Sequence, residues 1–74
     1  MIADHIVFTP VANRKLPNLR VAVLYGQEVG YCYQPEDQPD VWRSYARIDT
    51  RVYFLYKTYN VNDAMEAIKL AVYK

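Results

Sequence analysis

Alternation of apolar and polar side chains predicts β-strands along most of the chain before residue 60. The alternation is weak in the first segment and clear afterwards, and the segments are residues 3–8, 19–25, 28–34, 41–48 and 51–59. In the third segment Gly30 and Cys32 share one face. Side chains this small are expected beneath a bulky element that packs on the sheet.

Glycine, proline and short polar residues mark the connections. Residues 26–27 fit a two-residue hairpin turn, because Gly26 readily adopts the positive φ that such turns require. Residues 49–50, Asp-Thr, fit a second short turn. Prolines and asparagines predict a loop over residues 10–18. The run PEDQPD at 35–40 cannot sustain a central strand and predicts a projecting, solvated loop.

The two strands at 41–48 and 51–59 carry aromatic side chains on both faces. In the first of them Trp42, Ser44, Ala46 and Ile48 alternate with Val41, Arg43, Tyr45 and Arg47. In the second, Val52, Phe54, Tyr56 and Thr58 alternate with Arg51, Tyr53, Leu55, Lys57 and Tyr59. One face can pack in the core, so the other needs a partner, a second copy of the chain, or an exposed apolar surface.

The period of the pattern changes at residue 60. Apolar side chains then recur at helical spacing and predict a helix over residues 60–74, with a stripe of Val61, Ala64, Met65, Ile68, Ala71 and Val72. Asn60 or Asn62 can cap its N-terminus, where Asp63 and Glu66 also suit the helix dipole. A helix of about three to four turns does not persist alone in water, so its stripe must pack on the sheet.

These elements predict one α+β domain over residues 1–74. The expected fold is a small antiparallel sheet of three to four strands in β-β-β-β-α order, with one C-terminal helix packed on one face. A chain of 74 residues leaves no room for a second core. A domain this small buries only about 60% of its unfolded surface, so oligomerisation, for example as a homodimer, is an expected source of added stability.

Cysteine content and hydropathy point to the cytoplasm. Cys32 is the only cysteine, which excludes an internal disulfide and suits a reducing compartment. The N-terminus has no basic leader before a long apolar run, and no apolar run reaches the ~18 residues of a membrane span. We therefore expect a soluble, cytoplasmic protein without membrane contacts.

The chain carries no recognisable catalytic or cofactor motif. His5 and Cys32 lack a third orienting group, and the available metal-ligating side chains show neither zinc nor EF-hand spacing. Gly26 and Gly30 are the two glycines, and no phosphate-binding lysine follows them. We expect neither enzyme activity, nor a cofactor, nor a bound metal.

The candidate binding residues are mainly tyrosine and arginine, which are enriched where protein interfaces concentrate their binding energy. The side chains expected to line one exposed face are Arg43, Tyr45, Arg47, Arg51, Tyr53 and Lys57. The alternative is that the aromatic ones belong to the core of a small sheet. The sequence does not separate the two interpretations.

The acidic cluster Glu36, Asp37 and Asp40 is a second candidate contact, suited to a basic partner surface. Its alternative is a solvated loop without a specific role. Nine basic and eight acidic side chains give a formal net charge of +1, which is small for a DNA-binding domain. Nonspecific affinity for nucleic acid is therefore expected to be weak.

Residues 42–72, WRSYARIDTRVYFLYKTYNVNDAMEAIKLAV, resemble the AP2-like and integrase arm-binding domains, and the upstream run GYCYQPEDQPD resembles their first hairpin. These families pair a three-stranded sheet with a C-terminal helix and place sheet residues in DNA grooves. The resemblance implies a similar topology and assigns DNA contacts to Trp42, Arg43, Tyr45, Arg47 and Arg51. The acidic run departs from the family, where a basic or neutral turn would favour DNA binding.

Two functions are consistent with these features. Small size, no catalytic constellation, and a Tyr/Arg face beside an acidic loop predict a non-enzymatic protein-binding module. An inhibitor or modulator of phage or mobile-element type, such as an anti-CRISPR protein acting on a host nucleoprotein complex, fits that description. The alternative is a nucleic-acid-binding domain of AP2-like type that reads DNA with its sheet.

Overall fold

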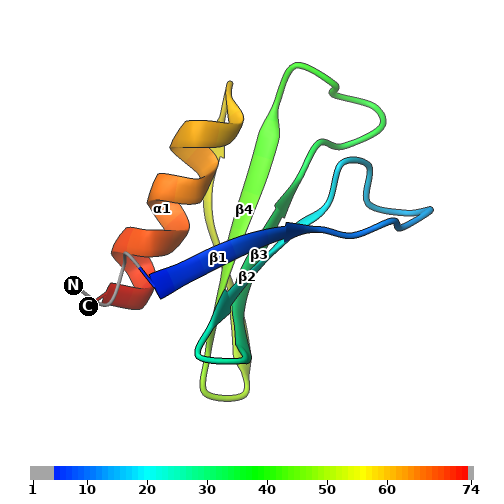
Figure 1. The fold of residues 1–74 in the computed structure, drawn as a ribbon. Coiled ribbons are helices and arrows are strands. Elements are labelled where there is room, and N and C mark those ends of the chain that lie inside the picture. Colours follow the sequence, from blue (N-terminus) through cyan, green and yellow to red (C-terminus); the bar gives the residue numbers. More distant parts are fainter. Residues whose placement is uncertain (1–4, 74) are drawn as a thin grey trace.

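The computed structural model describes residues 5–73 as a five-stranded antiparallel sheet with a helix on one face (Figure 1). The elements are β1 (Ile6–Pro10), β2 (Arg20–Leu24), β3 (Gln27–Tyr33), β4 (Trp42–Ile48), β5 (Arg51–Thr58) and α1 (Val61–Tyr73). The strands lie side by side in chain order, so β1 and β5 form the two edges of the sheet. The predicted α+β class and the C-terminal helix are confirmed.

The sheet has five strands, where three to four were predicted. The weakly alternating first segment pairs along its whole length with β2, from Ile6 opposite Leu24 to Pro10 opposite Arg20. Ile6 is buried, whereas Val7 is exposed. Ile6 and the partly buried Phe8 face the core, so one face of this edge strand is buried, and the apolar Val7 on its exposed face explains the weak alternation. Residues 3 and 4 of the predicted strand lie outside the described residues.

Two tight turns close the hairpins. Tyr25 and Gly26 form the β2–β3 turn, with φ values of 50° and 80°. Positive φ at both central residues is typical of a type I′ turn, whose twist matches that of the flanking strands. The sequence analysis placed this turn one residue too late. Asp49, with φ of 58°, opens the predicted turn between β4 and β5.

A bulge changes the side-chain alternation of β5. Arg43 pairs with Lys57 and Tyr45 pairs with Phe54, so two residues of β5 share the space opposite Ser44. Ser44 is fully buried, and its hydroxyl donates a hydrogen bond of 3.2 Å to the carbonyl of Tyr56. An extra residue of this kind reverses the face to which the following side chains point. A similar irregularity lies between β2 and β3.

The helix α1 begins with the predicted cap. The side-chain oxygen of Asn60 accepts a 2.8 Å hydrogen bond from the backbone N–H of Asp63, and its amide donates to the Asp63 carboxylate at 3.0 Å. The cap satisfies one of the N–H groups that a first helical turn leaves free. α1 is the one helix within residues 5–73, and it is neither long nor apolar enough to cross a membrane.

The helix packs over a row of small residues. Ala22, Gly30 and Ala46 are aligned across β2, β3 and β4, and all three are buried. A Cβ atom built on Gly30 would lie 2.9 Å from Cγ2 of Ile68, so α1 lies directly above this row. The prediction that small side chains underlie a bulky element is confirmed. The buried cluster comprises Ile6, Ala22, Cys32, Trp42, Ala64 and Ile68.

The two longer loops lie together at one end of the sheet, opposite the two tight turns (Figure 1). Gln34 joins residues 11–19 to residues 34–41. Its backbone N–H donates to the carbonyl of Pro17 at 2.9 Å, and its side-chain amide donates to the carbonyl of Pro39 at 2.7 Å. The loops therefore form one hydrogen-bonded unit.

Candidate functional site

The sheet face opposite α1 carries no helix within the described residues (Figure 1). Packed aromatic rings occupy the centre of this face. Strand register aligns Tyr31, Tyr45 and Phe54 across β3, β4 and β5. Gly30 faces α1, so the alternation of β3 turns Tyr31 and Tyr33 to the opposite, open face. We call Tyr31, Tyr33, Tyr45 and Phe54 the aromatic strip.

The rings of the aromatic strip pack against one another. Tyr31 and Tyr45 have ring centroids 4.8 Å apart and planes inclined by 17°. Tyr33 lies 6.1 Å from Tyr45 with nearly parallel planes, and Phe54 meets Tyr45 at 5.4 Å with a 60° tilt. Offset and tilted pairs at these spacings are favourable. The strip is therefore an ordered surface in which Tyr45 is the central ring.

Close packing makes two of the hydroxyls harder to ionise. Partial burial raises the pKa of Tyr45 and of Tyr31, and the neighbouring Tyr33 raises both further. For Tyr31, the Glu28 carboxylate adds to the rise in pKa. The folded-state pKa of each hydroxyl exceeds its unfolded-state value. The contribution of these neutral hydroxyls to the free energy of unfolding is therefore fully present below about pH 10 and is lost as the pH rises through the folded-state pKa.

We expect the free energy of unfolding to fall more steeply as the pH rises above about 10 in the wild type than in the double variant Tyr31→Phe, Tyr45→Phe, which lacks the two shifted hydroxyls. Urea unfolding followed by the fluorescence of Trp42, the single tryptophan, measures the difference. Tyr25→Phe, at an exposed turn position, is the control and should follow the wild type. Parallel declines in all three proteins would contradict the expectation.

Two basic side chains flank the aromatic strip. Arg43 and Lys57 are direct cross-strand partners, and with Tyr45 and Phe54 they line a hollow of about 430 Å³. Like charges placed opposite each other in a sheet repel. Arg43 meets one neutral acceptor, the side-chain oxygen of Gln38, at 3.5 Å. The hollow thus combines positive charge with aromatic walls and suits an anionic group.

The six basic and aromatic residues predicted to share one face divide between both faces. Those on the open face are Arg43, Tyr45, Arg47 and Lys57. Arg51 pairs with Ile48 and Tyr53 pairs with Ala46, which is buried on the helix side. The prediction is wrong for Arg51 and Tyr53, because the bulge interrupts the alternation of β5 between Tyr53 and Lys57.

Arg47 is already engaged on the open face. Its guanidinium lies 3.7 Å from the carboxylate of Glu28, and both side chains are nearly half exposed. A surface ion pair of this kind contributes at most about 1 kcal/mol to stability. This ion pair lies beside the aromatic strip, on the side away from Arg43. That side of the strip therefore carries one positive and one negative side chain.

The acidic loop borders the open face. Its carboxylates belong to Glu36, Asp37 and Asp40, all exposed. Backbone hydrogen bonds from Gln38 to Pro35 and from Val41 to Gln38 shape the loop, and the bond between Gln38 and Arg43 joins it to β4. No three His, Cys, Asp or Glu side chains within residues 5–73 gather closely enough to hold a metal ion. Negative charge is thus displayed beside the basic hollow.

Cys32 is a structural residue of the hydrophobic core. Its side chain is fully buried, and burial raises the pKa of the thiol to about 11, although the nearby Arg20 lowers it in part. A protonated, inaccessible thiol is a poor nucleophile. His5 instead lies against the ring of Tyr25, with centroids 5.4 Å apart.

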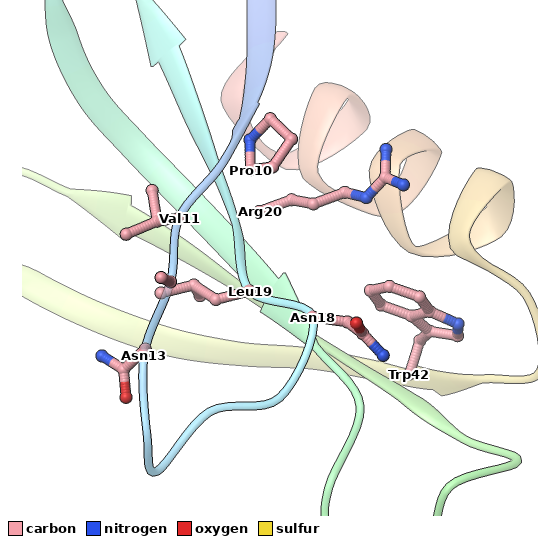
Figure 2. Close-up of a pocket in the computed structure, with 8 residues that line it drawn as sticks. Pro10, Val11, Asn13, Asn18, Leu19, Arg20 and Trp42 are labelled. Carbon is pink, nitrogen blue, oxygen red and sulfur yellow. The ribbon is translucent and has the colours of Figure 1, made fainter.

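A second hollow, of about 530 Å³, lies between the end of β1, the loop at 11–19 and Trp42 (Figure 2). Arg20 and Trp42 line it from β2 and β4, and Trp42 is only 8% exposed, although the resemblance assigns it a DNA contact. The side-chain oxygen of Asn13 accepts two backbone N–H groups of its own loop, and the Asn18 amide donates to Gln34. This groove therefore offers fewer free binding groups than the open face.

Tyr31, Tyr33 and Phe54 are site residues that the sequence analysis did not single out. The alternation of residues 28–34 places Tyr31 and Tyr33 on one face, opposite Gly30. That signal was sufficient to find a tyrosine face on β3. The register that joins it to Tyr45 is not visible in the sequence.

Comparison of the chain with protein-family models, with curated proteins and with solved structures found no match. Function must therefore be inferred from the surface itself.

Proposed function

We propose that the protein is a non-enzymatic binding module that docks a protein partner on its open sheet face and thereby inhibits or modulates that partner. The observation that carries the proposal is the aromatic strip, which is uncovered within the described residues and bordered by charged side chains. Interface hot spots are enriched in tyrosine and arginine. Rings that are already packed together lose little side-chain freedom when a partner binds.

The packing of the rings favours a protein over a single-stranded nucleic acid. Bases stack on exposed ring faces, whereas Tyr31 and Tyr45 cover part of each other at 4.8 Å. The net charge of +1 and the acidic loop beside Arg43 add little attraction for phosphates. A protein surface of mixed charge suits both features, with a carboxylate for the basic hollow and a basic group for the acidic loop.

The test is a capture experiment with matched charge reversals. The wild type and the double variant Arg43→Glu, Lys57→Glu are immobilised, and proteins retained from cell extract are quantified by mass spectrometry. We expect at least one protein whose recovery falls about tenfold or more with the variant, which corresponds to about 1.4 kcal/mol of binding free energy. Reversal removes the positive charge that attracts the partner's carboxylate.

The control reverses an arginine and a lysine elsewhere. Arg14→Glu with Lys15→Glu makes the same change in charge on the exposed loop at 11–19. The captured protein should be retained by this control as by the wild type. Equal losses with the two variants would mean that net charge, and not the open face, determines binding.

A nucleic-acid-binding function is the second candidate, because a phosphate would also fit between Arg43 and Lys57. Fluorescence anisotropy with labelled single-stranded and duplex DNA at about 50 and 200 mM salt tests it. We expect affinities weaker than about 10 μM at the higher salt, in the range of nonspecific binding. Tight, salt-sensitive binding that the charge reversal abolishes would replace the protein-binding proposal.

A further inference from the structure

The edge strand β5 concentrates exposed apolar surface. Six of the ten large apolar side chains found exposed within residues 5–73 lie on β5 or next to it, namely Val52, Tyr53, Phe54, Tyr56, Tyr59 and Leu70. Val52 and Phe54 lie on the open face and Tyr53 on the helix side, so this apolar surface surrounds the edge of the sheet. Concentrated exposed apolar surface on a monomer often marks an interaction site. The outer edge of a strand also presents unpaired backbone N–H and C=O groups. Both properties favour pairing with another strand.

The two edges of the sheet are unequal. β1 has five residues and ends at Pro10, which cannot donate a backbone hydrogen bond. β5 has eight residues and contains neither proline nor glycine. Its charged residues, Arg51 and Lys57, lie near its two ends and leave an apolar stretch between them. Of the two edges, β5 is therefore the one suited to pairing.

We propose that two copies of the chain pair antiparallel through β5 and form a homodimer with a continuous sheet. The register that fits is centred on Tyr53, which sets Val52 opposite Phe54 of the second copy and Arg51 opposite Leu55. β5 alternates regularly as far as Leu55, so this register keeps each opposed pair on one face of the sheet.

The charges select this register over its neighbour. A register centred on Phe54 would set Arg51 opposite Lys57 of the second copy, and like charges directly opposite each other repel. With Tyr53 at the centre, Lys57 instead extends toward the turn of the second copy that carries Asp49. Opposite charges then meet at both ends of the paired segment.

The exposed apolar side chains lie on both faces of the β5 edge, so pairing would cover only part of each, in an interface at the small end of the biological range. On the helix side, a hollow of about 300 Å³ between β5 and α1 is lined only by apolar and aromatic residues, including Leu55, Ala67 and Leu70. The second copy would cover this hollow.

Pairing leaves the open face of each copy free and extends it across the dimer axis. Phe54, the β5 end of the aromatic strip, would lie beside Val52 of the second copy. The two strips would then form one surface, although the dimer itself does not depend on the partner binding proposed above.

Light scattering at about 100 μM protein should give roughly twice the chain mass of 8.7 kDa, decreasing on dilution as mass action requires. Val52→Lys should weaken the dimer by about thirtyfold or more, because a lysine then faces Phe54 of the second copy. Val7→Lys makes the same change at an exposed valine of β1 and should leave the mass unchanged. A monomeric wild type, or equal effects of the two substitutions, would overturn the proposal.

A cross-link tests the register without relying on a destabilised variant. Tyr53→Cys places two thiols across the proposed axis, where opposed Cα atoms lie about 4.5–5.5 Å apart, within the range that a disulfide spans, so mild oxidation should yield a covalent dimer. Thr9→Cys on β1 is the control and should stay monomeric, and the buried Cys32 should not react. Absence of the cross-link at position 53, or equal cross-linking at position 9, would contradict pairing through β5.

Discussion

Replacing Ile68 by alanine is expected to destabilise the fold by about 3–4 kcal/mol. Ile68 is the largest of the fully buried side chains, with 0% exposure, and it lies between α1 and the row of small residues on the sheet. Truncation leaves a cavity that paired strands cannot collapse to fill. A domain of this length has a total stability of about 4–11 kcal/mol, so much of it would be lost.

Urea unfolding followed by Trp42 fluorescence measures this effect, because Trp42 belongs to the same buried cluster. Ile68→Val should cost only about 1 kcal/mol, since it removes a single methyl group. Ile48→Ala is the matched control, with the same truncation at a half-exposed position, and should cost about 1 kcal/mol or less. Similar losses for Ile48→Ala and Ile68→Ala would show that Ile68 is not the packing centre of the helix.

The helix was the element best determined by sequence. Its apolar stripe, its capping residue and its need for the sheet all derive from local spacing, and the Asn60 cap and the burial of Ala64 and Ile68 confirm them. Ala67 is also buried but stood outside the predicted stripe. Alanine fits either the apolar or the polar face of a helix, so periodicity alone could not assign it.

The strands were less well determined, because register is a property of pairs. The strand segments were found, but β1 carries little alternation, and the predicted sheet had three to four strands where the structure has five. The bulge opposite Ser44 reversed the faces of Arg51 and Tyr53 relative to Lys57. A bulge adds one residue without an obvious sequence mark, and every side chain beyond it changes face.

The candidate site was therefore predicted only in part. Arg43, Tyr45, Arg47 and Lys57 share the open face, because they lie on one strand or directly across from it. The contribution of Tyr31 and Tyr33 required the pairing of β3 with β4, which sets Tyr31 beside Tyr45. Such long-range pairing is fixed by the whole sheet and not by any one segment.

Gly30→Ala is expected to cost about 2–3 kcal/mol, although alanine is normally better than glycine in a strand. The added Cβ would lie 2.5 Å from the backbone carbonyl oxygen of Tyr45 and 2.9 Å from Cγ2 of Ile68. The side chain of Ile68 can shift by changing its rotamer, but the carbonyl belongs to the paired backbone of β4. Either α1 rises from the sheet or the β3–β4 pairing distorts.

Gly26→Ala distinguishes this packing effect from a backbone effect. Gly26 has φ of 80° and open space around its Cβ position, so alanine there should cost about 1 kcal/mol through backbone strain alone. The loss at Gly26 should not change when Ile68 is replaced by leucine, which removes the γ2 methyl group but keeps the volume.

The loss at Gly30 should decrease by about 1 kcal/mol in the same Ile68→Leu background, because one of the two close contacts is then absent. The loss of stability that remains in the Ile68→Leu background measures the contact with the Tyr45 carbonyl, which no side-chain change relieves. Urea unfolding of the four proteins in the Gly30 and Ile68 cycle gives this coupling directly. Additive losses would mean that α1 does not pack on Gly30, and the helix would then have to dock on the sheet in another position.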